Sequence, residues 1–140
     1  MDLNSRSRLA WTALRILVAG LVAAHGYYRM LSGGVEGFGG WLTSQHVPGA
    51  LVVAWAVTLS EVIGSVLLVA GRWFVFPTTL LLAAIYATGI VMVHAPSGWF
   101  VVGAGRNGAE YSVLLIAVLL CVGLQHCPTR DRAVRNTDLE

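Results

Sequence analysis

Residues 50–70 read ALVVAWAVTLSEVIGSVLLVA, a run of 21 residues in which Glu61 is the only charge. A helix of about 20 apolar residues crosses the hydrocarbon core of a bilayer, so this run is long enough to span one. A carboxylate near the middle of a span costs roughly a few kcal/mol, even on the scales that penalise it least. Glu61 must therefore pair with a cation, be protonated or face a water-filled cavity.

The composition extends the membrane interpretation to the whole chain. Of its 140 residues, 56% are hydrophobic and 11% are charged, and the mean hydropathy is +0.72. Soluble domains average about 25% charged residues. We therefore expect an integral membrane protein with one domain over residues 1–140. The first apolar segment runs from Leu9 past Gly26. It exceeds the apolar region of a typical signal peptide, so a retained span is favoured over a cleaved one.

Four apolar segments predict an all-α, integral membrane four-helix bundle. The expected spans are about 9–30, 50–70, 73–94 and 110–126. Glycine and proline interrupt the chain between residues 31 and 49, and the apolar residues of this loop predict a short amphipathic element on the membrane surface. The glycine-rich loop of residues 95–109 carries Trp99 and Phe100, which are typical of interfacial anchors.

All nine basic residues are arginine, and their distribution predicts how the bundle is oriented. Four spans place both termini on one side of the membrane. The expected terminal side carries most of the arginines, namely Arg6, Arg8, Arg15, Arg72, Arg130, Arg132 and Arg135. The opposite loops carry only Arg29 and Arg106. The positive-inside rule therefore predicts that both termini are cytoplasmic.

The rise of a helix predicts which polar side chains share a depth. At about 1.5 Å per residue, Glu61 lies roughly 16 Å below the outer face and Arg15 roughly 20 Å below it. We therefore expect a structural ion pair between Arg15 and Glu61 that joins the first two spans. The alternative is that Arg15 extends to the cytoplasm while Glu61 is protonated or faces a cavity open to the outside.

A second group of polar residues lies near the expected outer face. It comprises His25, Arg29, His94 and Glu110, with Trp99 and Asn107 in the adjoining loop. One interpretation is a hydrogen-bonded lid that joins the helix ends. The other is a pocket, completed by Glu61, for a polar headgroup such as that of a quinone, because His and Glu supply donors and a proton route. A metal site is disfavoured, since the HxxxH and ExxH spacings are absent.

Several of these residues belong to motifs that follow one another along the chain. In order, they are Arg15, His25-Gly26 followed by Arg29, Glu61, Gly71-Arg72, His94 before Pro96-Ser97-Gly98-Trp99-Phe100, and Asn107-Gly108-Ala109-Glu110-Tyr111. Over about residues 12–126 this pattern resembles the DoxX/DoxD family of four-helix bacterial and archaeal membrane proteins. The resemblance implies a multi-pass protein of the cytoplasmic membrane. One departure is Arg29, since family members often have lysine there.

The resemblance also implies a redox setting. Some members are similar to the small membrane subunit of thiosulfate:quinone oxidoreductase, and others are linked to membrane complexes that handle thiol and oxidative stress. One hypothesis is therefore a subunit of a redox complex that binds a quinone or assists electron and proton transfer to it. Its expected binding residues are His25, Arg29, Glu61, His94, Trp99 and Glu110.

The alternative hypothesis is a structural accessory subunit that stabilises a larger membrane complex without chemistry of its own. The chain shows no haem, flavin or nucleotide motif of its own, so either role calls for partner subunits. A transporter is less favoured, because the sequence lacks inverted repeats and interrupted spans.

Overall fold

The structure, a computed structural model, describes residues 2–103 and 107–128. Every regular element in these ranges is helical. The elements are α1 (Leu3–Leu31), α2 (Gly34–Ser44), α3 (Ala50–Ala70), α4 (Val75–Gly89), a π-helical turn η1 (Ile90–His94), a 3-10 turn η2 (Ala95–Ser97) and α5 (Glu110–Gln125). Three segments, Leu3–Leu31, Ala50–Ala70 and Val75–Ser97, are long and apolar enough to cross a membrane, and α5 is a shorter apolar helix. The predicted all-α membrane fold is confirmed.

The first helix begins at Leu3, earlier than the expected start of the span at residue 9. Its cap explains the extension. The Asp2 carboxylate accepts a hydrogen bond of 2.8 Å from the backbone N–H of Ser5, which satisfies one of the donors that a helix start leaves free. Hydrogen bonding by the side chain of Ser5, together with that by its backbone N–H, lowers the pKa of Asp2.

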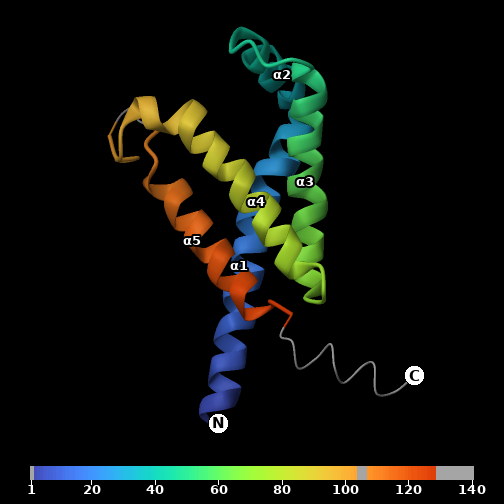
Figure 1. The fold of residues 1–140 in the computed structure, drawn as a ribbon, viewed down its shortest axis with the longest axis vertical. Coiled ribbons are helices and arrows are strands. Elements are labelled where there is room, and N and C mark those ends of the chain that lie inside the picture. The colour runs from blue at the N-terminus through green and yellow to red at the C-terminus, as the bar shows by residue number, and fades with distance from the viewer. Residues whose placement is uncertain (1, 104–106, 129–140) are drawn as a thin grey trace, which may run out of the picture.

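The membrane helices form two antiparallel pairs, α1 with α3 and α4 with α5 (Figure 1). The pairs meet near the end of the molecule that carries the start of α1, and they diverge toward the opposite end, where α2 lies. Between them is an apolar core with residues from all four helices: Val18, Ala19, Val22, Leu68, Val75, Leu82, Ala83, Leu115, Leu119 and Val122. The start of α1 and the end of α5 lie at the same end of the bundle, as an even number of spans requires.

The segment between the first two spans folds back as α2 along α3. Val35, Gly39 and Leu42 recur at helical spacing on one face of α2 and are buried. Val35 and Leu42 pack with Ala50 and Ala54 of α3 in a second apolar cluster, and Gly39 lies against Leu51. The expected amphipathic element is therefore present as a helix, and α3 covers its apolar face.

This packing lets α3 extend beyond the end of α1. The two helices touch at Gly26, where an added Cβ would lie 2.8 Å from the Cβ of Glu61. From that level α1 ends at Leu31, whereas α3 extends as far as Ala50. At about 1.5 Å per residue, α3 therefore extends roughly 9 Å further than α1. The extension is the part of α3 that α2 covers.

The close approach at Gly26 gives a prediction for stability. In Gly26→Ala, the new methyl group meets the Cβ of Glu61 at 2.8 Å and the backbone nitrogen of Val62 at 3.1 Å, so α1 and α3 must separate. Overpacking of this kind costs about 1–3 kcal/mol. We expect the purified variant to unfold at a lower temperature than wild type in detergent.

Gly20→Ala is the matched control for this prediction. It is the same substitution on the same helix, and nothing lies within 4 Å of the added Cβ. Because alanine favours a helix over glycine by about 1 kcal/mol, this variant should be as stable as wild type or more so. Equal stability of the two variants would contradict the close packing at Gly26.

Candidate functional site

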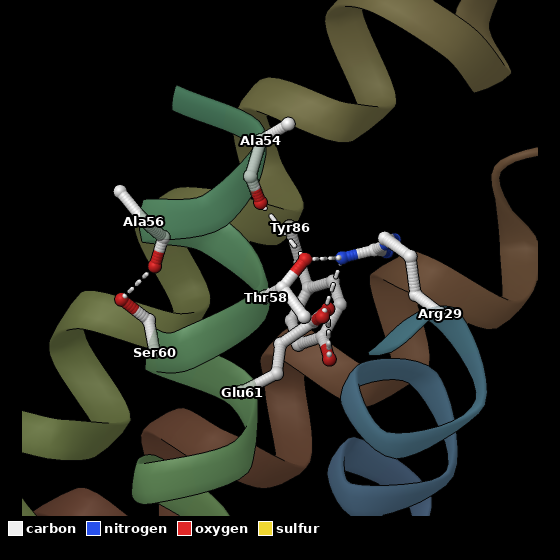
Figure 2. A network of polar contacts seen from close by, with 7 residues as sticks. All are labelled: Arg29, Ala54, Ala56, Thr58, Ser60, Glu61 and Tyr86. Carbon is white, nitrogen blue, oxygen red and sulfur yellow. Dashed lines mark hydrogen bonds and ion pairs between the residues drawn. The ribbon is translucent and has the colours of Figure 1, made fainter. Parts of the chain in front are cut away.

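Glu61 is 1% exposed, and both of its carboxylate oxygens are hydrogen-bonded. Oε2 accepts from Nη1 of Arg29 at 2.8 Å, and Oε1 accepts from the hydroxyl of Tyr86 at 3.2 Å. Figure 2 shows these side chains, from α1, α3 and α4, pointing toward one another between the helices. A buried charge is compensated in this way by an opposite charge together with further hydrogen bonds. Of the environments considered for Glu61, the structure shows a pair with a cation.

Thr58 extends this network by almost one helical turn of α3. Its Oγ1 accepts a hydrogen bond of 3.2 Å from Nη1 of Arg29 and donates one of 2.8 Å to the carbonyl of Ala54. No buried side-chain nitrogen or oxygen in the described part of the chain lacks a hydrogen-bond partner. The network therefore holds α1, α3 and α4 together without leaving a polar group unsatisfied.

The predicted ion pair between Arg15 and Glu61 is wrong. Arg15 lies at the other end of α3, where its Nη1 donates to the carbonyls of Leu68 and Val69. The prediction fails because it assumes that the outer ends of the first two spans lie at one level, whereas α3 extends beyond α1. Arg15 instead satisfies carbonyls in the last turn of α3, where a positive charge also suits the helix dipole.

An open cleft of about 390 Å³ lies beside the network, along the end of α1 and the start of α2. Its lining residues are Ala24, His25, Tyr28, Arg29, Ser32 and Gly34. The side chain of Arg29 is 21% exposed and that of Glu61 only 2%. Arg29 therefore borders the cleft, whereas Glu61 is buried and is not among its lining residues.

Arg29 has hydrogen-bond donors that its contacts with Glu61 and Thr58 do not use. Of its guanidinium nitrogens, only Nη1 has a hydrogen-bond partner among the described residues. A guanidinium carries five N–H donors, so Nε and Nη2 remain available. The ring centroid of Phe38 on α2 lies 4.8 Å from Cζ of Arg29, which is a cation–π contact. Arg29 is thus oriented from two sides and still able to bind a ligand.

His25 is the second polar group of the cleft. It precedes Arg29 by four residues and so lies on the same face of α1. Its ring centroid is 6.1 Å from that of Tyr86 and 6.4 Å from that of Tyr111, so aromatic rings of α4 and α5 border it. An imidazole nitrogen donates or accepts a hydrogen bond according to its tautomer. His25 and Arg29 therefore offer two different hydrogen-bonding groups to one ligand, beside the hydroxyl-bearing residues Tyr28 and Ser32.

The other predicted site residues lie around the connection between α4 and α5. Nδ1 of His94 is 2.9 Å from the carbonyl oxygen of Asn107. Oε1 of Glu110 accepts from the backbone N–H of Val101 at 3.0 Å, and the N–H of Glu110 donates to the carbonyl of Trp99 at 3.0 Å. None of His94, Trp99 and Glu110 is among the residues that line the cleft. Their geometry fits the lid interpretation, in which hydrogen bonds join helix ends.

Sequence reasoning missed Tyr86, which binds Glu61, and Tyr28 and Ser32, which line the cleft. One signal was present for Tyr86. It lies at the middle of the third span, whereas tyrosines of membrane helices gather at the two interfaces. Tyr28 and Ser32 carry no such signal, because residues of these types are common near the end of a span.

A family model described as DoxX matches residues 10–95, from α1 to the first residue of η2. The chain belongs to the DoxX family. No match was found for it among curated proteins or among solved structures. DoxX membership agrees with the resemblance seen in the sequence, although the motif at Asn107–Tyr111 lies beyond the matched residues. Together with the apolar spans, it makes this a multi-pass membrane protein.

The pairing of Arg29 with Glu61 predicts a specific pattern of stabilities. Arg29→Met leaves the carboxylate of Glu61 buried without its cation, which should lower the free energy of unfolding by about 3–5 kcal/mol. The double variant Arg29→Met/Glu61→Met should recover most of this loss, because no charge remains buried. Denaturant unfolding of the purified proteins in micelles measures the coupling.

Arg15→Met provides the control, as the same substitution on the same helix at an arginine that contacts backbone carbonyls. Its coupling to Glu61→Met should stay below about 0.5 kcal/mol, as for residues without direct contact. Coupling of Glu61 to Arg15 as strong as that to Arg29 would show that the pairing is wrong.

Proposed function

We propose that this protein is the small membrane subunit of a redox complex and that it binds a quinone headgroup in the cleft at His25 and Arg29. The observation that carries the proposal is the state of Arg29. One of its nitrogens is held by Glu61 and Thr58, its other nitrogens have no hydrogen-bond partner among the described residues, and Arg29 lines an open cleft together with His25. A quinone presents two carbonyl oxygens, which accept hydrogen bonds from groups of this kind.

The charge balance of the cleft favours a neutral ligand. Arg29 is compensated by Glu61 at 2.8 Å, so the pair adds no net charge to the site. An anionic headgroup would gain most from an uncompensated cation, because charge-assisted hydrogen bonds are the stronger ones. A quinone accepts hydrogen bonds and is neutral, which suits donors whose charge is already paired.

In this proposal, each residue of the network has its own part. Arg29 donates a hydrogen bond to one carbonyl oxygen, and Glu61 with Phe38 holds its guanidinium in place. His25 binds a quinone oxygen and gives it a proton through a ring nitrogen, and the second proton comes from solvent in the open cleft. Reduction of a quinone to a quinol takes up two electrons and two protons. The electrons come from a partner subunit of the redox complex.

The quinone proposal predicts the effect of His25→Phe. This change keeps an aromatic ring beside Tyr86 and Tyr111 and removes both ring nitrogens. Since one hydrogen bond contributes about 1 kcal/mol, affinity for a tailless benzoquinone should fall about five- to tenfold. Binding to purified protein is measured by equilibrium dialysis. His46→Phe, outside the cleft, is the matched control and should bind like wild type.

Two outcomes would contradict the proposal. One is equal quinone affinity in wild type and His25→Phe. The other is a folded wild-type protein that binds no quinone. The second outcome would favour the accessory subunit without chemistry of its own, for which the hydrogen-bonded connection at His94, Trp99 and Glu110 would supply rigidity.

We also propose that the protein lies in a bacterial or archaeal cytoplasmic membrane with both termini in the cytoplasm and the cleft toward the outer face. The arginine asymmetry supports this orientation. Cys127 and Ser97 lie at opposite ends of the bundle, beyond α5 and α4, and are exposed.

Cysteine labelling tests the orientation with a membrane-impermeant maleimide on intact cells. In a Cys121→Ala background, Cys127 should react only after permeabilisation. In a Cys121→Ala/Cys127→Ala background, Ser97→Cys should react without it. The reverse pattern would show that the bundle is inserted the other way.

A further inference from the structure

A narrow apolar groove runs between α1 and α5. It is separate from the cleft at His25 and Arg29 and shares no lining residue with it. Its volume is about 100 Å³, against about 390 Å³ for the cleft. The groove is lined by Leu14, Leu17, Val18 and Leu21 from α1 and by Tyr111, Leu114, Leu115 and Val118 from α5. The hydroxyl of Tyr111 is the only polar side-chain group in this lining, so the groove suits a hydrocarbon chain.

The groove and the cleft lie on one stripe of α1. Residues three or four apart on a helix share a face. Leu14, Leu17 and Leu21 follow this spacing, and His25 and Tyr28 of the cleft continue it. The opposite stripe of α1, which includes Gly26, packs against α3. The groove is therefore in line with the cleft along the helix.

Tyr111 joins the two spaces. It lines the groove, and its ring centroid lies 6.4 Å from that of His25, which lines the cleft. On the opposite wall of the groove from Tyr111, Leu21 of α1 lies one helical turn from His25. An amphiphile with its headgroup at His25 would thus place the next part of its chain directly against Leu21 and Tyr111.

The direction of the groove also suits such a ligand. From Leu21 to Leu14 it runs along α1 for about 10 Å, away from the cleft and across the centre of the span. Leu17 and Leu114, on opposite walls, are each 62% exposed, so the groove is open on the side that faces lipid. A chain can therefore enter it from the bilayer and continue into the bilayer at its far end.

We infer that the groove between α1 and α5 binds the isoprenoid tail of the quinone whose headgroup lies in the cleft at His25 and Arg29. This inference rests on the proposed quinone site and adds a second determinant to it. The ligand is then a tailed quinone, selected by hydrogen bonds at its ring and by apolar contacts along the first part of its tail.

The test compares two probes, a tailless benzoquinone and the same ring carrying a two-isoprene tail. Both are measured on purified protein in nanodiscs, with partition into empty nanodiscs subtracted. Burial of several carbon atoms in the groove should make the tailed probe bind at least about tenfold more tightly to wild type. Leu17→Trp and Leu114→Trp, which fill the groove from opposite walls, should abolish this preference and leave the tailless probe unaffected.

Leu81→Trp is the matched control, at an exposed leucine of α4 outside the groove, and it should keep the preference. The two groove variants alter different helices. If one of them fails to fold, the other still tests whether the groove binds the tail. Equal affinity of the two probes for wild type would overturn the tail site while leaving the headgroup site intact. Absence of binding by either probe would instead remove the proposed function itself.

Native mass spectrometry separates the quinone tail from a phospholipid chain as the occupant. The tailed probe should displace any lipid retained by wild type, and both groove variants should retain less of that probe. A phospholipid that stays bound in the presence of the tailed probe, and is lost only in the groove variants, would assign the groove to phospholipid and overturn the inference.

Discussion

The ion pair between Arg29 and Glu61 is the interaction on which the arrangement of this bundle depends. A charged carboxylate in the middle of an apolar span is stable only when a nearby positive charge or hydrogen-bond donor compensates it. Here the compensation comes from two other helices, through the guanidinium of Arg29 and the hydroxyl of Tyr86. The pair requires α1 and α3 to approach closely, which the absence of a side chain at Gly26 permits. It also fixes the level at which α1 passes α3.

The packing of α2 on α3 is compatible with the same level, so α2 is more than a connection between two spans. The first turns of α3 lie beyond the end of α1, and α2 packs against them. Arg29 is thereby placed beside Thr58 and close to Glu61, and Phe38 of α2 lies against its guanidinium. The same shift places Arg15 at the last turn of α3, where it reaches the carbonyls of Leu68 and Val69. With α1 and α3 at this relative level, Arg29 pairs with Glu61, whereas Arg15 of the same helix binds backbone carbonyls.

Much of the fold is predictable from sequence because hydrophobic length is a direct physical requirement of a membrane span. The bounds of α3 match the apolar run around Glu61, and the need for a cation near Glu61 follows from the cost of its charge. Which arginine supplies the cation was not predictable. Helix rise gives relative depth only when the ends of two spans are aligned, and the packing of α2 that shifts them leaves no periodic signal in α1.

In the candidate site, too, some features were predictable from the sequence and others were not. His25 and Arg29 are four residues apart, so their common face follows from helix geometry alone, and both line the cleft. His94, Trp99 and Glu110 were grouped with them by depth only. Depth does not fix the direction in which a side chain points, and these residues bond within the connection between α4 and α5 instead.

The shortness of α5 affects the bilayer around the protein. Its 16 residues span about 24 Å, less than the roughly 30 Å of a typical hydrocarbon core. A short apolar helix is matched to its surroundings by local thinning of the membrane or by tilting of its neighbours. In Figure 1, α5 is paired with α4, which leans across the bundle. Hydrophobic mismatch should therefore be concentrated beside α5, and lipid packing should be most disturbed on the side of the molecule where α5 meets α1.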